Sequence, residues 1–143
     1  MLSAYPACFF REESGYSVIF PDLNYLATCG KNLEEALSMA IDCLAGYLYW
    51  CKRDKDIIPK PSPLNKISAS NVSKELGIDY SESSDSFVNL VTVDVEEYAR
   101  EHFEKAVKKT LTIPAWLNNA ALQQNINFSQ VLQEALKEQF HVK

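Results

Sequence analysis

The most constraining feature of this sequence is a strand pattern near its C-terminus that has no partner within its own segment. Between Val107 and Ile113 side chains alternate with a period of two, which is typical of a β-strand, and Pro114 then suits the first position of a helix. One strand and two short helices bury little surface and leave the strand's backbone groups unpaired. Residues 106–143 are therefore predicted to fold as a homodimer in which two copies pair their strands antiparallel.

The outward face of this paired strand predicts contact with DNA. If Leu111 and Ile113 enter the joint core, the opposite face presents hydroxyl and cationic side chains, and a two-stranded ribbon fits the major groove. The second helix begins at Asn127, and its first backbone donors, at Phe128 and Ser129, suit a phosphate. The alternative is a helical hairpin used only for dimerisation. The candidate DNA-binding residues are Lys108, Thr110, Thr112, Asn127, Phe128 and Ser129.

Charge is distributed unevenly along the chain. The net charge of −5 argues against nucleic-acid binding by the chain as a whole, but residues 106–143 carry +2 and residues 1–105 carry −7. The pattern Lys-x-Thr-x-Thr before Ile113-Pro114, followed by Ile-Asn-Phe-Ser from Ile126, resembles the ribbon-helix-helix repressors. Operator DNA is the partner that this resemblance implies for the C-terminal segment.

The N-terminal segment has the pattern of an α+β domain. Residues 3–10 and 16–20 are predicted to form a hairpin, residues 25–29 a third strand and residues 87–93 a fourth. Pro6 cannot donate to a ladder, which predicts that its strand lies at a sheet edge or that Pro6 lies on its outward side. We predict two domains, 1–105 and 106–143.

The longest predicted helix spans residues 33–52, with Asn32 and Glu35 as a capping box at its start. Shorter helices are expected at 70–76 and 94–105, with a polar loop at 80–86 between them. The aromatic residues near the end of the long helix suit a partner surface or, more simply, core packing. The apolar positions predicted to face the core are Leu33, Leu37, Ala40, Leu44, Leu48 and Cys51.

Composition excludes several classes of protein. With 47% hydrophobic and 23% charged residues the chain suits a packed core, and it has neither a signal peptide nor an apolar run long enough for a membrane span. A cytoplasmic location is expected. The four cysteines form no Cys-x-x-Cys pair, so we expect small buried side chains and no metal or cofactor.

Four short motifs are together similar to the HicB antitoxin family. They are Tyr5-Pro-Ala, Gly15-Tyr-Ser-Val-Ile-Phe-Pro-Asp-Leu23, Leu33-Glu-Glu-Ala-Leu37 and Ile58-Pro-Lys-Pro-Ser62. Family members usually have Pro-Gly after the leucine of the second motif, where this chain has Asn24-Tyr25. The resemblance implies a partial ribonuclease-H-like N-terminal lobe and a C-terminal ribbon-helix-helix domain.

The resemblance also implies a binding role. The N-terminal lobe would cover a small basic HicA-like toxin, a messenger-RNA ribonuclease that uses a histidine, and the dimer would repress its own operon. Asp22 is the candidate toxin contact, and a turn-stabilising aspartate is the alternative. The predicted strands hold no converging carboxylates for Mg²⁺, so we expect no enzyme activity. The competing hypothesis is a stand-alone ribbon-helix-helix regulator whose N-terminal lobe senses a ligand.

Overall fold

The chain divides into two compact units in the computed structural model, which describes residues 1–78 and 85–142. Unit 1 spans Met1–Ala106 and unit 2 spans Val107–Lys143. Each unit has its own secondary structure. Most of the polar loop expected at 80–86 lies outside the described residues.

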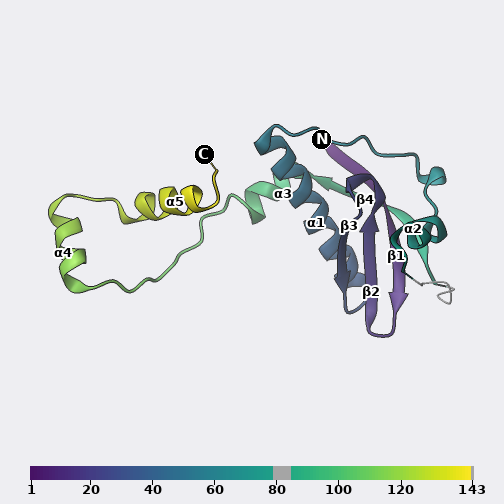
Figure 1. The fold of residues 1–143 in the computed structure, drawn as a ribbon, viewed down its shortest axis with the longest axis horizontal. Coiled ribbons are helices and arrows are strands. Elements are labelled where there is room, and N and C mark those ends of the chain that lie inside the picture. The colour runs from purple at the N-terminus through teal and green to yellow at the C-terminus, as the bar shows by residue number, and fades with distance from the viewer. Residues whose placement is uncertain (79–84, 143) are drawn as a thin grey trace. The chain divides into compact units, whose positions relative to one another are not determined.

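Unit 1 is an α+β domain built on a four-stranded antiparallel sheet with strand order β3-β2-β1-β4 (Figure 1). The predicted hairpin and the two further strands are all present, and the hairpin turn is shorter than expected, at residues 13–14. The strands are β1 (Leu2–Glu12), β2 (Gly15–Phe20), β3 (Leu26–Gly30) and β4 (Phe87–Asp94). The helices are α1 (Leu33–Asp54), α2 (Ala69–Leu76) and α3 (Val95–His102), with 3₁₀ turns η1 (Pro21–Leu23) and η2 (Leu64–Lys66).

Helices pack against both faces of the sheet, α1 on one face and α2 on the other (Figure 1). Phe9 of β1 stacks on Phe87 of β4 with ring centroids 4.8 Å apart, which joins two strands far apart in the sequence. The smaller cluster on the α2 face includes Phe10 and Val72. The buried side chains of the main core on the α1 face include Tyr5, Phe9, Val18, Phe20, Leu23, Leu44, Leu48 and Val91.

Helix α1 begins where the sequence predicts, because the Asn32 side chain accepts a hydrogen bond from the backbone of Glu35 at 2.8 Å. Its predicted apolar stripe is wrong at its start: Leu33 and Leu37 are exposed, and Ala36 is buried instead. Gly30 explains the difference. A Cβ there would lie 2.3 Å from the Ala36 nitrogen, so the helix approaches β3 too closely for large side chains between them.

Of the two alternatives predicted for Pro6, the edge strand is wrong, because β1 is an inner strand with β2 and β4 on its two sides. The ladder between β1 and β2 runs only from Cys8 to Glu12, so Pro6 has no ladder bond to lose on that side. On the other side Pro6 stands opposite Leu90. In antiparallel sheets alternate pairs exchange no backbone hydrogen bonds, and a proline fits such a pair without loss.

The remaining predicted helices of unit 1 are present. Gly77 ends α2 in the left-handed conformation, with φ of 66°. Helix α3 ends before its predicted end, at His102. The next residue, Phe103, packs against Tyr49 and Tyr98. The cysteine prediction holds for Cys8 and Cys51, which are buried, and is wrong for exposed Cys29 and half-buried Cys43. Among the described residues no helix is long and apolar enough to span a bilayer.

Unit 2 contains two helices and an extended segment. Helix α4 (Ala115–Gln123) follows Pro114, and α5 (Phe128–Gln139) follows Asn125, whose φ of 53° is the left-handed turn that the sequence predicts. The strand predicted between Val107 and Ile113 is not formed in the single chain, where residues 106–114 pair with no other strand among the described residues. Among the described residues of this unit, 107–142, none is buried.

Candidate protein and nucleic-acid interfaces

Asp22 joins two segments of unit 1 that are far apart in the sequence. Its two carboxylate oxygens accept hydrogen bonds from the Ser62 backbone N–H and hydroxyl, both at 2.7 Å. The Tyr5 hydroxyl donates to the Pro59 carbonyl nearby, and burial, followed by the charge of Asp22, raises the pKa of Tyr5. These contacts fasten the proline-rich segment 57–63 to the sheet. Sequence analysis predicted a role for Asp22 and missed Ser62. The two residues are 40 positions apart, and no local sequence pattern around Ser62 indicates this contact.

The turn after Asp22 has an unusual backbone. Asn24 and Tyr25 both have φ near 57°, in the left-handed region that a bulky side chain such as tyrosine rarely adopts. The Tyr25 hydroxyl donates to the Glu75 carboxylate on α2, which raises the pKa of Tyr25. The Asn24 amide donates to the Tyr47 hydroxyl at 3.4 Å. The side chains of both residues therefore hold this turn against helices on opposite faces of the sheet.

An apolar groove of about 400 Å³ is lined by Leu26 of β3, by residues of the second half of α1 and by Asp56. Its aromatic wall is formed by Tyr47 and half-exposed Trp50, and the Arg53 guanidinium lies 5.3 Å from the centre of the Trp50 ring. Asp56 supplies its one carboxylate. The groove has the lining of a protein-contact surface, with an aromatic anchor and a charged rim.

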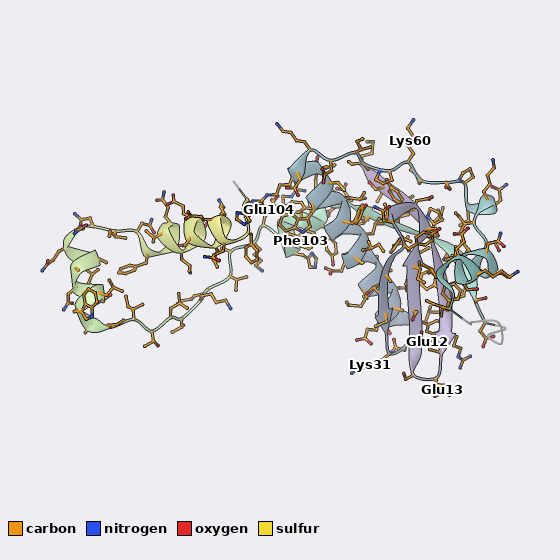
Figure 2. The ribbon with its side chains drawn as sticks, in the orientation of Figure 1. Glu12, Glu13, Lys31, Lys60, Phe103 and Glu104 are labelled. Atoms are coloured by element: carbon orange, nitrogen blue, oxygen red, sulfur yellow. The ribbon has the colours of Figure 1, made fainter. Side chains whose placement is uncertain are left out.

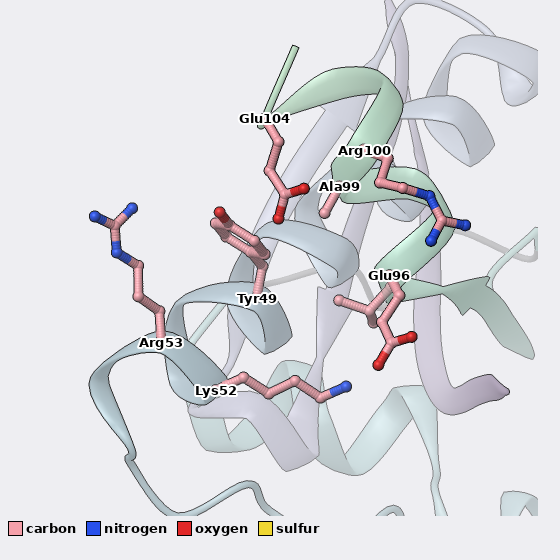
Figure 3. A pocket seen from close by; sticks show the side chains of 8 residues that line it. Tyr49, Lys52, Arg53, Glu96, Ala99, Arg100 and Glu104 are labelled. Carbon is pink, nitrogen blue, oxygen red and sulfur yellow. The ribbon is translucent and has the colours of Figure 1, made fainter.

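A second hollow, of about 430 Å³, lies between the end of α1 and α3 (Figure 3). Tyr49, Val95 and Ala99 contribute its apolar part. The Lys52 side chain extends across the opening in the direction of Glu96, and Glu104 lies beside Tyr49 (Figure 3). Both hollows are open to solvent, so neither is an enclosed ligand cavity.

The end of unit 1 is anchored by an aromatic cluster on α3. The Tyr98 hydroxyl donates to Asp42 of α1 at 2.9 Å, and burial together with this bond raises the pKa of Tyr98 to about 12. Phe103 lies next to α1, at the opposite side of the domain from the sheet turns that carry Glu12 and Glu13 (Figure 2). These contacts hold α3 and Phe103 against α1, close to the end of unit 1 at Ala106.

In unit 2, the residues predicted to touch DNA are solvent-exposed. Lys108, Thr110 and Thr112 all lie in the extended segment before α4. The Asn127 side chain caps α5 by accepting from the Gln130 backbone at 3.1 Å. Among the described residues no acceptor is bonded to the backbone N–H of Phe128 or Ser129. Both groups are thus available to an anion at the helix N-terminus.

The acidic side chains of unit 1 are dispersed. Glu35 serves the start of α1, Glu12 accepts from the Ser17 hydroxyl, and Asp22 binds Ser62. Within residues 1–78 and 85–142, no three histidine, cysteine, aspartate or glutamate side chains converge on a position that could hold a metal ion. Glu12, Glu35 and Asp22 therefore make contacts within the fold.

Comparison with known proteins agrees with this architecture. A family model described as the HicB-like antitoxin of bacterial toxin–antitoxin systems matches residues 4–70. A solved toxin–antitoxin complex from Streptococcus pneumoniae contains a chain 32% identical to this one, with a TM-score of 0.66, and the match covers 97% of this chain and 99% of that chain. The chain belongs to the HicB-like antitoxin family. Its family match contains Asp22 and Ser62, while the Streptococcus match extends over both units.

Curated HicB antitoxins resemble a shorter part of the chain. Antitoxin HicB 2 of Photorhabdus laumondii is 41% identical over 58 residues, covering 41% of this chain and 42% of that protein. Antitoxin HicB 1 of the same organism is 42% identical over 55 residues, covering 38% and 36%. The matched segment thus spans about two fifths of the length of these curated relatives.

Proposed function

We propose that this protein is an antitoxin that binds and neutralises a HicA-like messenger-RNA ribonuclease in the cytoplasm and represses its own operon. The observation that carries the proposal is the similarity, over nearly the whole chain, to a protein of a solved toxin–antitoxin complex. Unit 1 would bind the toxin as a partial ribonuclease-H-like lobe, and unit 2 would bind operator DNA.

The exposure of unit 2 supports a ribbon-helix-helix homodimer formed by residues 106–143. Val107, Leu111 and Trp116 expose 79%, 62% and 71% of their surface in the single chain, and Phe140 on α5 exposes 75%. An apolar surface of this extent marks an interaction site. A second copy would cover it and would let residues 107–113 form the paired strand that the sequence predicts. Lys108, Thr110 and Thr112 would then face DNA, with Asn127, Phe128 and Ser129 at a phosphate.

Neutralisation would be steric and electrostatic. Residues 1–105 carry a net charge of −7, which suits a basic partner. No step would require catalysis by this chain, a metal or a cofactor. The alternative, a stand-alone regulator with a ligand-sensing lobe, would need an enclosed apolar pocket. The two hollows described in unit 1 are both open to solvent and so give this alternative no support.

Co-expression tests this function. The small protein of the neighbouring reading frame should arrest growth when expressed alone, and this chain should restore growth and elute with it as one complex. The purified chain should cleave no RNA in the presence of Mg²⁺ or Mn²⁺. If the two proteins elute separately and growth is not restored, the antitoxin assignment is wrong. If the purified chain cleaves RNA, and mutation of Asp22 or Glu34 abolishes the cleavage, the chain is an enzyme.

Variants of Asp22 and Ser62 distinguish a toxin-binding role of Asp22 from a purely structural one. Asp22→Asn should lower the free energy of unfolding by about 1–3 kcal/mol, because two hydrogen bonds to a charged carboxylate are weakened. Ser62→Ala removes one of those bonds and keeps the charge. If Asp22 contacts the toxin, Asp22→Asn should weaken toxin binding more than Ser62→Ala, as measured by calorimetry. Equal weakening would leave Asp22 a purely structural residue.

A further inference from the structure

The apolar groove of unit 1 differs in charge from the hollow between α1 and α3. That hollow is lined by three cations, Lys52, Arg53 and Arg100, together with two carboxylates (Figure 3). In the groove, Asp56 is the only charged residue among the described residues that line it. The groove is therefore an apolar surface with a single negative charge. Its other lining residues are Leu26, Cys43, Tyr47, Trp50 and Cys51.

The end of α1 places Asp56 at the groove. Lys55 ends the helix in the left-handed conformation, with φ of 58°, and the Asp56 N–H donates to the Cys51 carbonyl at 2.9 Å. Within residues 1–78 and 85–142 the Asp56 carboxylate has no hydrogen-bond or ion-pair partner. Burial, followed by the charges of Asp56 and Asp54, raises the pKa of Cys51. Two carboxylates thus act on this part of the groove, and that of Asp56 is available to a cation.

The apolar part of the groove suits the stem of a basic side chain. Lysine and arginine bury their methylene groups on apolar surfaces and keep the charged head near water or a counter-ion. Trp50 is 49% exposed, and the Arg53 guanidinium already lies 5.3 Å from the centre of its ring, so the ring is accessible to cations. At about 400 Å³ the groove is larger than one side chain, which leaves room for an apolar neighbour.

The groove adjoins the candidate toxin contact at Asp22. The Asn24 amide donates to the hydroxyl of Tyr47, which joins the turn after Asp22 to the wall of the groove. Burial, followed by the charges of Asp22, Cys51 and Tyr47, raises the pKa of Tyr5, so these three groups lie around the Tyr5 hydroxyl. The groove and the Asp22 site are therefore parts of one continuous surface.

We infer that the groove binds a lysine or arginine side chain of a basic protein, with the stem against Tyr47 and Trp50 and the charged head at Asp56. The inference rests on the proposed function, under which this basic protein is the toxin. The net charge of −7 on residues 1–105 attracts such a partner from a distance, whereas the groove supplies a specific contact. Trp50 is the anchor, because tryptophan is enriched among the residues that dominate binding energy.

Calorimetry with the full chain and the small protein of the neighbouring reading frame tests the groove. Trp50→Ala should weaken binding about thirtyfold or more and Asp56→Asn about tenfold, because each removes one part of the contact. Asp56→Asn should also make the salt dependence of binding shallower. Glu104→Gln removes a carboxylate from the other hollow and is the matched control, which should bind like the parent chain.

Charge reversal identifies the side chain that occupies the groove. Asp56→Lys places a like charge against the incoming cation and should weaken binding more than Asp56→Asn. Each lysine and arginine of the small protein is then replaced in turn with glutamate. One of these replacements should restore binding to the Asp56→Lys chain by about tenfold or more. If none restores binding, the occupant is not a basic side chain and the inference is wrong.

The outcomes separate this inference from the proposed function. If the parent chain does not bind the small protein, both fail. If the parent binds and either Trp50→Ala or Asp56→Asn binds equally well, the inference fails and the proposed function stands. A Trp50→Ala chain that binds the small protein normally and sediments with fewer copies than the parent would show that a second copy covers the groove. Circular dichroism and melting temperature check that each variant is folded.

Discussion

A chain that ends at Lys105 should bind no operator DNA and should still bind the toxin. Unit 1 has its own core around Phe9, Phe20 and Leu44, so its fold does not depend on residues 106–143. The proposed DNA contacts all lie in the segment that is removed. We expect the affinity for operator to fall by a factor of about a thousand or more, to the level of non-specific binding. Gel retardation and calorimetry with the toxin measure the two activities.

The full-length Leu111→Lys variant is the control for this truncation. It keeps every residue of the proposed DNA surface and disrupts the apolar core that the two copies of unit 2 would share. It should lose operator binding as the truncated chain does, while toxin binding persists in both. If the truncated chain still retards operator DNA, unit 1 contains the DNA site and the division of labour between the units is wrong.

Replacing Thr110 or Thr112 with alanine should lower affinity for the operator more than affinity for random DNA. Both side chains lie in the exposed segment before α4. In the proposed ribbon a short hydroxyl there would reach a base edge in the major groove. Loss of one base contact costs about 1–3 kcal/mol, or roughly 5- to 150-fold in affinity. Lys108→Ala should instead weaken both kinds of DNA and make the salt dependence shallower if it contacts a phosphate.

Binding to operator and random duplexes at several salt concentrations measures these effects. Thr28→Ala on β3 makes the same chemical change in unit 1 and should bind operator like the parent chain. Sedimentation checks that each variant keeps its oligomeric state, because Leu111 and Ile113 are expected to point the other way. Threonine variants that remain dimeric and bind operator normally would show that this face does not contact bases.

Local sequence signals predicted most of the elements. Asn32 and Asn127 cap α1 and α5 as expected, Gly77 ends α2, and Asn125 adopts the left-handed turn between α4 and α5. These signals act within one helical turn, so the chain's own chemistry determines them. The separation of an acidic segment from a basic one, and the strand pattern without a partner, are likewise properties of the sequence alone.

Contacts between distant segments depended on the tertiary structure. The close approach of Gly30 to Ala36 determines which side of α1 is buried. Pro6 is tolerated in an inner strand because the ladder between β1 and β2 begins only at Cys8. Asp22 was predicted only as a toxin contact or a turn residue. The hydrogen bonds from Ser62 show that it also holds the proline-rich segment in place. Periodicity reports which side of an element is apolar. Which apolar side chains become buried depends on backbone spacing and register, and those exist only after the sheet has formed.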